Sequence, residues 1–242
     1  MKSNDRLETE KVKKVHYILI GNDFKKVLKT LDKRLHFYRF LNEGKFKGDE
    51  IIYDVPSNML SNAGLVLSKQ NEEDKTYFKV RKISTLPGGY KRPSQKFSLG
   101  ECEGTEEPKD FPIQISNAIS NSFSNAFTID LVSVVRQTVP KIQITVTGQK
   151  YKIISGDGFE AYMLYEKAIY KDIATKKKVK RYGVTFKLPK DEKWDKWNNE
   201  ILQAVEHYCK EMVSYESSRF EIAQRLLYPK PYVEEKKEES EE

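Results

Sequence analysis

The chain has 242 residues, enough to bury a substantial hydrophobic core, and a formal net charge of +7. It has no apolar run near the roughly 18 residues that a membrane-spanning helix needs, and its first residues are charged, unlike a secretion signal. Its two cysteines, Cys102 and Cys209, lack metal-type spacing and fit reduced thiols, so we expect a cytoplasmic protein.

The charge is unevenly distributed along the chain. Residues 233–242 hold six Glu and two Lys and carry a net charge of −4, so the remainder carries +11. We predict a single domain over residues 1–232, followed by a disordered acidic tail. A basic body suggests an anionic partner, although lysines also serve simply to keep a surface soluble.

The first elements follow from the spacing of apolar residues. Alternation predicts a strand over residues 13–20, and apolar residues at helical spacing predict a helix over residues 24–35. The aromatic run 36–41 fits either the end of that helix or a strand. Residues 42–48 are polar and are expected to form a loop.

Residues 49–82 are the most informative stretch. A turn is predicted at residues 54–57 because Asp54, Pro56 and Ser57 are turn formers. A short helical turn should follow, and Gly64 should let the chain leave it through a positive φ. The flanking strands are expected over residues 50–53, 65–70 and 77–82.

The second half of the chain predicts more strands and two amphipathic helices. A helix is expected from Pro112, and a long one from Trp194 to Met212, because apolar residues recur every three or four positions. A further apolar set follows at residues 220–226. Strands are expected over residues 96–100, 129–138, 141–147, 151–155 after a turn at Gly148, 159–172 and 182–188. About eight antiparallel strands indicate an α+β fold, with a closed or strongly curved β-barrel, flanking helices and a long C-terminal helix.

Part of this sequence resembles one protein family. Residues 52–56 (IYDVP), Leu60 and residues 63–65 (AGL) resemble the second-strand region of CYTH proteins, the triphosphate tunnel metalloenzymes. Residues 13–227 can be laid on that family's order of elements. The resemblance implies an eight-stranded tunnel in which carboxylates hold a divalent metal while Lys and Arg hold a triphosphate. Charge neutralisation of this kind is what phosphoryl transfer needs.

The resemblance also implies phosphate ligands. Lys79 and Arg81 alternate on the family's lysine strand, and Arg136 lies in an apolar segment where the family has a basic residue. Lys187 falls on the late strand, and Arg219 on the closing helix. For each of them the alternative is a solvated surface or a structural ion pair. We predict that these five residues contact a phosphate-rich small anion: a triphosphate, a polyphosphate or a nucleotide.

Several family signatures are missing. Ser68 and Gln70 stand where arginines are expected, and residues 182–188 carry no acid where alternating glutamates are expected. Two acids lie near the first-strand Glu-x-Glu-x-Lys signature, but aligning them with it puts Val12 in the lysine position. Alignment by the helix that follows leaves no acid on the signature positions. The candidate metal ligands are Glu8, Glu10 and Glu160, with Glu50 and Glu166 as alternatives if a strand is shifted in register.

Two functions therefore stay open. The first is an anion-binding CYTH-like barrel that, if catalytic, hydrolyses its ligand with Mg²⁺ or Mn²⁺, although no catalytic residue is assigned. The second is a catalytically degenerate CYTH-like binding or interaction module without phosphatase activity, which the missing acids favour. Nucleic acid could also bind the basic segment from Lys176 to Arg181, although a solvated hairpin tip is the favoured interpretation.

Overall fold

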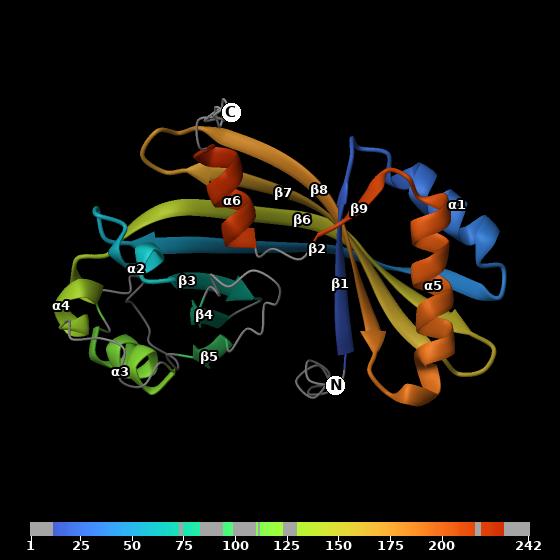
Figure 1. Ribbon diagram of the computed structural model, residues 1–242, viewed down its shortest axis with the longest axis horizontal. Coiled ribbons are helices and arrows are strands. Elements are labelled where there is room, and N and C mark those ends of the chain that lie inside the picture. The colour runs from blue at the N-terminus through green and yellow to red at the C-terminus, as the bar shows by residue number, and fades with distance from the viewer. Residues whose placement is uncertain are drawn as a thin grey trace, which may run out of the picture.

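The computed structural model describes residues 12–72, 75–82, 94–98, 110, 112–122, 130–215 and 219–229. Within these ranges the chain forms one antiparallel sheet in the order β5-β4-β3-β2-β6-β7-β8-β1-β9, with helices packed on it (Figure 1). The strands are β1 (Val12–Leu19), β2 (Tyr38–Asp54), β3 (Leu65–Glu72), β4 (Lys75–Lys82), β5 (Ser94–Ser98), β6 (Val139–Ser155), β7 (Glu160–Asp172), β8 (Lys178–Pro189) and β9 (Met212–Ser214). The α-helices are α1 (Phe24–Arg34), α2 (Met59–Asn62), α3 (Pro112–Ser122), α4 (Leu131–Arg136), α5 (Asp195–Tyr208) and α6 (Arg219–Leu227), and a 3₁₀ turn, η2 (Glu192–Trp194), precedes α5.

The expected α+β architecture of antiparallel strands with flanking helices is confirmed. Closure of the sheet is not confirmed: β5 and β9 are its edge strands, and no pairing between described residues joins them. Among the described residues, no helix is long and apolar enough to cross a membrane.

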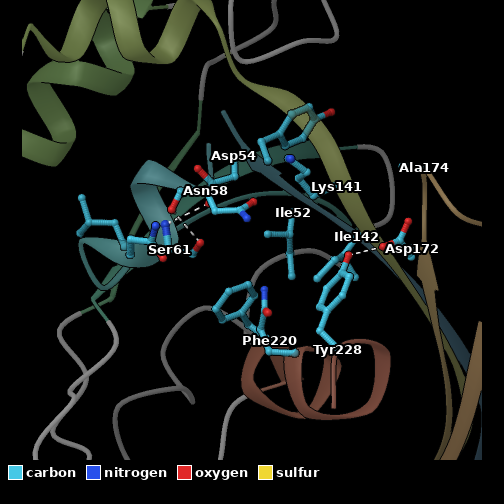
Figure 2. Close-up of a pocket in the computed structure, with 14 residues that line it drawn as sticks. Ile52, Asp54, Asn58, Ser61, Lys141, Ile142, Asp172, Ala174, Phe220 and Tyr228 are labelled. Carbon is cyan, nitrogen blue, oxygen red and sulfur yellow. Dashed lines mark hydrogen bonds between the residues drawn. The ribbon is translucent and has the colours of Figure 1, made fainter. Parts of the chain in front are cut away.

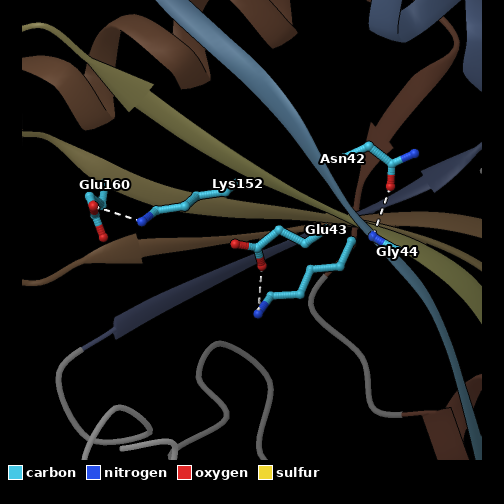
Figure 3. Close-up of polar contacts among 6 residues, drawn as sticks. Asn42, Glu43, Gly44, Lys152 and Glu160 are labelled. Carbon is cyan, nitrogen blue, oxygen red and sulfur yellow. Dashed lines mark hydrogen bonds and ion pairs between the residues drawn. The ribbon is translucent and has the colours of Figure 1, made fainter.

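Two 17-residue strands, β2 and β6, pair along most of their length and form the middle of the sheet. The predicted loop over residues 42–48 is wrong, because this segment continues β2 through a bulge. Gly44 takes φ 108° there and donates its backbone N–H to the Asn42 side chain at 2.9 Å (Figure 3). A positive φ of this size favours glycine, which lets the strand bend without breaking.

The predicted turn at Gly148 is also wrong, because Gly148 lies inside β6. A Cβ atom at this position would meet the Tyr165 carbonyl oxygen and lie 2.6 Å from Phe46 Cζ. Glycine is therefore required here by the close approach of a neighbouring strand and a ring, and not by a change of chain direction.

The apolar segment that contains Arg136 is a helix, so the predicted strand over residues 129–138 is wrong. The Asp130 side chain accepts hydrogen bonds from the backbone N–H groups of Val132 at 3.1 Å and Ser133 at 3.3 Å, which caps α4. The long helix predicted to reach Met212 ends at Tyr208, and Met212 begins β9. Tertiary packing decided both outcomes, since a short apolar run suits a strand or a buried helix equally well.

Three hydrophobic clusters hold helices on opposite faces of the sheet. At one end of the sheet, α1 and α5 pack on β1, β7 and β8 through residues that include Val27, Phe186 and Ile201. At the other end, α3 and α4 cover the same face of β3 and β4, while α6 covers the opposite face of β2, β6 and β7 through Phe220 and Ala223. The strands therefore have one face under α6 and a second face under the other helices, as the separated helices in Figure 1 show.

Candidate functional site

A polar cluster lies on the sheet face that carries α6. The pairing of Ile52 with Ser68 and of Ser68 with Lys79 places Lys79 on the same face as Glu50, which is two residues before Ile52 on β2. Arg81 lies two residues further along β4 on this face. Across the sheet, Glu50 pairs with Ile144 and Ile144 with Tyr170, so β7 contributes to the same surface.

Glu50 and Arg81 form the buried half of this cluster. The Arg81 guanidinium contacts the Glu50 carboxylate and also donates to Ser68 Oγ at 3.2 Å. The Glu50 side chain is 6% exposed and the Arg81 side chain 12%. Burial alone would raise the pKa of Glu50, but Arg81, the Ser68 hydroxyl and the charges of Arg219 and Lys79 together lower it below its ordinary value. Glu50 is therefore held as a carboxylate.

Arg219 and Glu166 form the more open half of the cluster. Arg219 is the first residue of α6, and its guanidinium donates to Glu166 Oε2 at 2.6 Å. The Arg219 side chain is 40% exposed, whereas that of Glu166 is 16% exposed. Burial would lower the pKa of Arg219, but the charges of Glu166 and Glu50 raise it. Tyr170 lies beside them with its pKa raised by burial, so it stays neutral.

The cluster combines three cations with two carboxylates. Lys79 and Arg81 come from β4 and Arg219 from α6, which is far away in sequence. Glu50 and Glu166 leave these cations with a net charge of +1. In a site largely withdrawn from water, each charge contact is stronger than at the surface. Such an arrangement can accept an anion whose oxygens replace the carboxylates as partners of the arginines.

One donor in the cluster has no partner among the described residues. Arg81 Nε is buried and makes no hydrogen bond within the part of the chain that the structure describes. A buried N–H without an acceptor costs free energy, so an oxygen-bearing ligand at this point would be stabilised.

The structure thus brings together three of the five predicted phosphate ligands. Lys187 lies on the same face, but it pairs with Tyr162, four residues and about 13 Å along β7 from Glu166. Arg136 is exposed on α4, on the opposite side of the sheet from α6. Neither residue reaches the cluster.

The predicted metal ligands do not come together among the described residues. Glu160 is at the far end of the sheet, where its carboxylate pairs with Lys152 at 2.7 Å, near a second ion pair between Lys150 and Glu43 at 2.9 Å (Figure 3). Glu8 and Glu10 lie outside the described residues. No group of three or more His, Cys, Asp or Glu side chains that could hold a metal occurs in the described ranges.

From the sequence, Glu50 and Glu166 were only alternative metal ligands, and Ser68 and Tyr170 were not assigned to a site. The available signal was a Glu directly before the apolar residues of a strand, since Glu50 precedes Ile51 and Ile52. A charge in such a position is rarely buried without a partner. The partner itself comes from another strand and could not be read from spacing along the chain.

A cavity of about 460 Å³ lies further along the same face, between α2, α6 and the ends of β2 and β6 (Figure 2). Its two carboxylates have structural partners. Asp54 accepts the backbone N–H groups of Val55, Leu60 and Ser61. Asp172 accepts the Thr175 N–H at 2.7 Å and the Tyr228 hydroxyl. Because these acids hold α2 and the β7–β8 hairpin in place, the polar cluster is the stronger candidate for the site.

Comparison with solved structures supports the fold. The chain is similar to the Hippeastrum protein HpAC1, a candidate adenylyl cyclase described as having a dominant triphosphatase activity, with a TM-score of 0.54 and 10% identity over 88% of this chain and 95% of that chain. It is also matched by a Pyrococcus horikoshii OT3 protein (TM-score 0.43, 10% identity, 88% and 99% covered) and by a Bacillus halodurans candidate adenylate cyclase (TM-score 0.40, 12% identity, 86% and 93% covered). No protein-family model and no curated protein sequence matches the chain.

The fold of this chain is therefore CYTH-like, as the segment around Asp54 predicted. At 10% identity the likeness concerns the arrangement of elements, and the chemistry of the site depends on the residues of this chain.

Proposed function

We propose that the chain is a CYTH-like binding protein that holds a triphosphate or polyphosphate between the sheet and α6, at the cationic cluster of Lys79, Arg81 and Arg219. The single observation that supports this proposal best is the buried Arg81 Nε, which has no partner among the described residues and lies beside a paired guanidinium nitrogen. A phosphate oxygen is a suitable acceptor for this N–H, and the condensed charge of a polyphosphate matches several cations at once.

The position of Arg219 favours entry of a ligand from the α6 side. Its side chain is more exposed than that of Arg81, and it begins a helix whose N-terminal N–H groups carry partial positive charge. An anion that bridges Arg219 and Arg81 would lie where the two carboxylates now neutralise them. In this proposal, α6 and the sheet together enclose the ligand, and a closed barrel is not required.

The described residues do not fit a Mg²⁺ or Mn²⁺ site. These ions prefer several oxygen ligands, and the cluster has only Glu50 and Glu166, each engaged by an arginine. We therefore propose that the anion binds without metal, and this favours a binding or interaction module over a metal-dependent phosphohydrolase.

Calorimetric titration with sodium tripolyphosphate in the presence of EDTA tests the proposal. We expect saturable binding that Arg219→Gln weakens by about tenfold or more, because a charge-assisted hydrogen bond is lost. Arg225→Gln is the matched control: it removes the same charge from the same helix, but Arg225 contacts the Tyr215 hydroxyl and is not in the cluster. Absence of binding, or equal weakening by both variants, would contradict the proposal.

The hydrolase alternative needs a separate measurement. Release of phosphate from tripolyphosphate or from nucleoside triphosphates, with Mg²⁺ or Mn²⁺ at alkaline pH, would show that the chain is an enzyme. Loss of that release in Glu50→Gln and Glu166→Gln, with release retained in Glu160→Gln, would assign it to the cluster.

A further inference from the structure

The sheet has a second charged surface, on the face opposite α6, where β2, β6, β7 and β8 lie between the part covered by α1 and α5 and the part covered by α3 and α4. The register places six lysines on this surface. We call it the outer lysine face; its lysines are Lys45, Lys47, Lys167, Lys171, Lys178 and Lys180.

Pairing across the strands shows how these lysines are arranged. Lys47 pairs with Thr147, Thr147 with Lys167, and Lys167 with Tyr182, which makes one row across four strands. Lys171 and Lys178 pair two rows further along. Strands are about 4.8 Å apart, and residues on one face are about 6.7 Å apart along a strand, so the lysines cover an area on the order of 14 Å by 20 Å.

This surface is strongly positive. Asp49 is the one acid that the register places among the six lysines in this part of the described strands, so the surface carries a net charge of +5. Asp49 is engaged by the Thr145 hydroxyl at 2.8 Å and by Lys47 at 3.4 Å. The remaining positions include Gln143, Thr147 and Gln149, which are partly or fully exposed.

Two tyrosines lie at one edge of the lysines. Their rings are parallel, with 4° between the planes and 6.2 Å between the centroids of Tyr165 and Tyr182. The Lys180 ammonium lies 5.5 Å from the Tyr182 ring centroid. Tyr165 is fixed by a hydrogen bond to Asn22 at 2.9 Å and by stacking on Phe24 at 4.2 Å. Rigid aromatic rings beside cations suit the stacking of bases whose phosphates bind the lysines.

We propose that the outer lysine face binds single-stranded nucleic acid. The cations are spread over several rows and do not converge on one point, which fits an extended polyanion better than a compact triphosphate. A membrane surface fits less well, because the large exposed hydrophobic residues of the described chain, such as Phe37, Leu41 and Val213, lie elsewhere. The hairpin tip at Lys176 is only the margin of this surface.

Fluorescence anisotropy with a labelled 12-nucleotide oligo-uridine RNA tests the proposal. We expect binding that weakens with salt and that Lys167→Gln/Lys180→Gln reduces by about tenfold at 0.1 M salt, with the slope of log K against log salt smaller by about 1.4, or 0.7 for each lost phosphate contact. Tyr182→Leu should weaken binding by about fivefold or more and leave that slope unchanged, because it removes stacking and not charge.

Lys29→Gln/Lys33→Gln is the matched control, because it removes two exposed lysines from α1. Thermal unfolding of each variant checks that it is folded. The proposal is overturned by absence of RNA binding, by equal weakening in the control pair, or by binding to vesicles with phosphatidylserine but not to RNA. A double-stranded RNA of the same length should bind more weakly, and preference for the duplex would also overturn it.

Discussion

Glu50 is a buried carboxylate whose charge is maintained by neighbouring cations. Burial opposes its ionisation. That effect is overcome, and the pKa of Glu50 is lowered, by Arg81, Ser68, Arg219 and Lys79. Pairs of this kind contribute little net stability when intact, whereas removing one partner leaves an uncompensated buried charge. The cluster is therefore tuned more to hold charge in place than to stabilise the fold.

This pairing makes stability depend on pH in a defined direction. The pKa of Glu50 is lower in the folded state than its ordinary value of 4.5, so the unfolded chain binds the proton more readily. The contribution of Glu50 is present above about pH 4.5 and is lost as the pH falls through the folded-state pKa. We expect Glu50→Gln to flatten the fall in the free energy of unfolding between about pH 5 and about pH 3, measured by urea denaturation.

The same variant should lower stability at pH 7 by about 3 kcal/mol, because the Arg81 charge is then buried without its partner. Glu43→Gln is the control: Glu43 lies on the same strand, but its ion pair with Lys150 is partly exposed, so its loss should cost less than about 1 kcal/mol. If the two variants behave alike, the Glu50–Arg81 pair is not buried in solution.

Among the elements, β6 shows how a glycine can be misleading in sequence. Gly148 resembles a turn residue, but it lies where β6 passes under the Phe46 ring and against the carbonyl of Tyr165. Nothing in the sequence near Gly148 records the approach of residues from two other strands. The case of α4 differs, because its cap, Asp130, directly precedes the apolar run in the sequence.

Gly148→Ala tests this packing. We expect it to lower the free energy of unfolding by about 2 kcal/mol, because the added methyl group meets backbone and ring atoms that cannot both move away. The control is Gly48→Ala on the neighbouring strand, where a Cβ atom would meet nothing within 4 Å. Chemical denaturation measures the free energy of unfolding of the two variants. An equal change in both would show that strand propensity, and not packing, is responsible.

The whole molecule presents two cationic surfaces on opposite faces of one sheet. Alternation along β7 puts Glu166 and Tyr170 under α6, while Lys167 and Lys171 point to the outer face. Of the net charge of +11 outside the acidic tail, the enclosed cluster carries +1 and the open surface +5.

Because the two surfaces share no residues, a substitution in one surface should change the affinity for its own ligand and leave the affinity for the other ligand unchanged. We expect Arg219→Gln to weaken tripolyphosphate binding while changing RNA affinity by less than about twofold, and Lys167→Gln/Lys180→Gln to do the reverse. Titrations of both variants with both ligands make this comparison. Parallel losses would mean that one surface accounts for both activities.

Local patterns in the sequence were sufficient for much of the fold. The strand–turn–helix–strand unit around Asp54, the first helix, and the alternating strands β7 and β8 are set by turn residues and by periodicity within a few positions, so they could be predicted. The CYTH-like arrangement followed from the same unit. Lys79, Arg81 and Arg219 were singled out because each is a basic residue at a position that matches a family element.

Only the tertiary structure decided which charges meet. Strand order and register bring Glu50 and Arg81 together, separate Lys187 from them, and form an open sheet from the described strands. The packing of α6 adds Arg219, and the packing of α4 on the other face keeps Arg136 away. The physical reason is that the alternation of residues along a strand specifies which side chains share a face, but it does not specify which other strand pairs with that strand. Pairing between distant segments depends on the packing of the whole chain, and that information is not local.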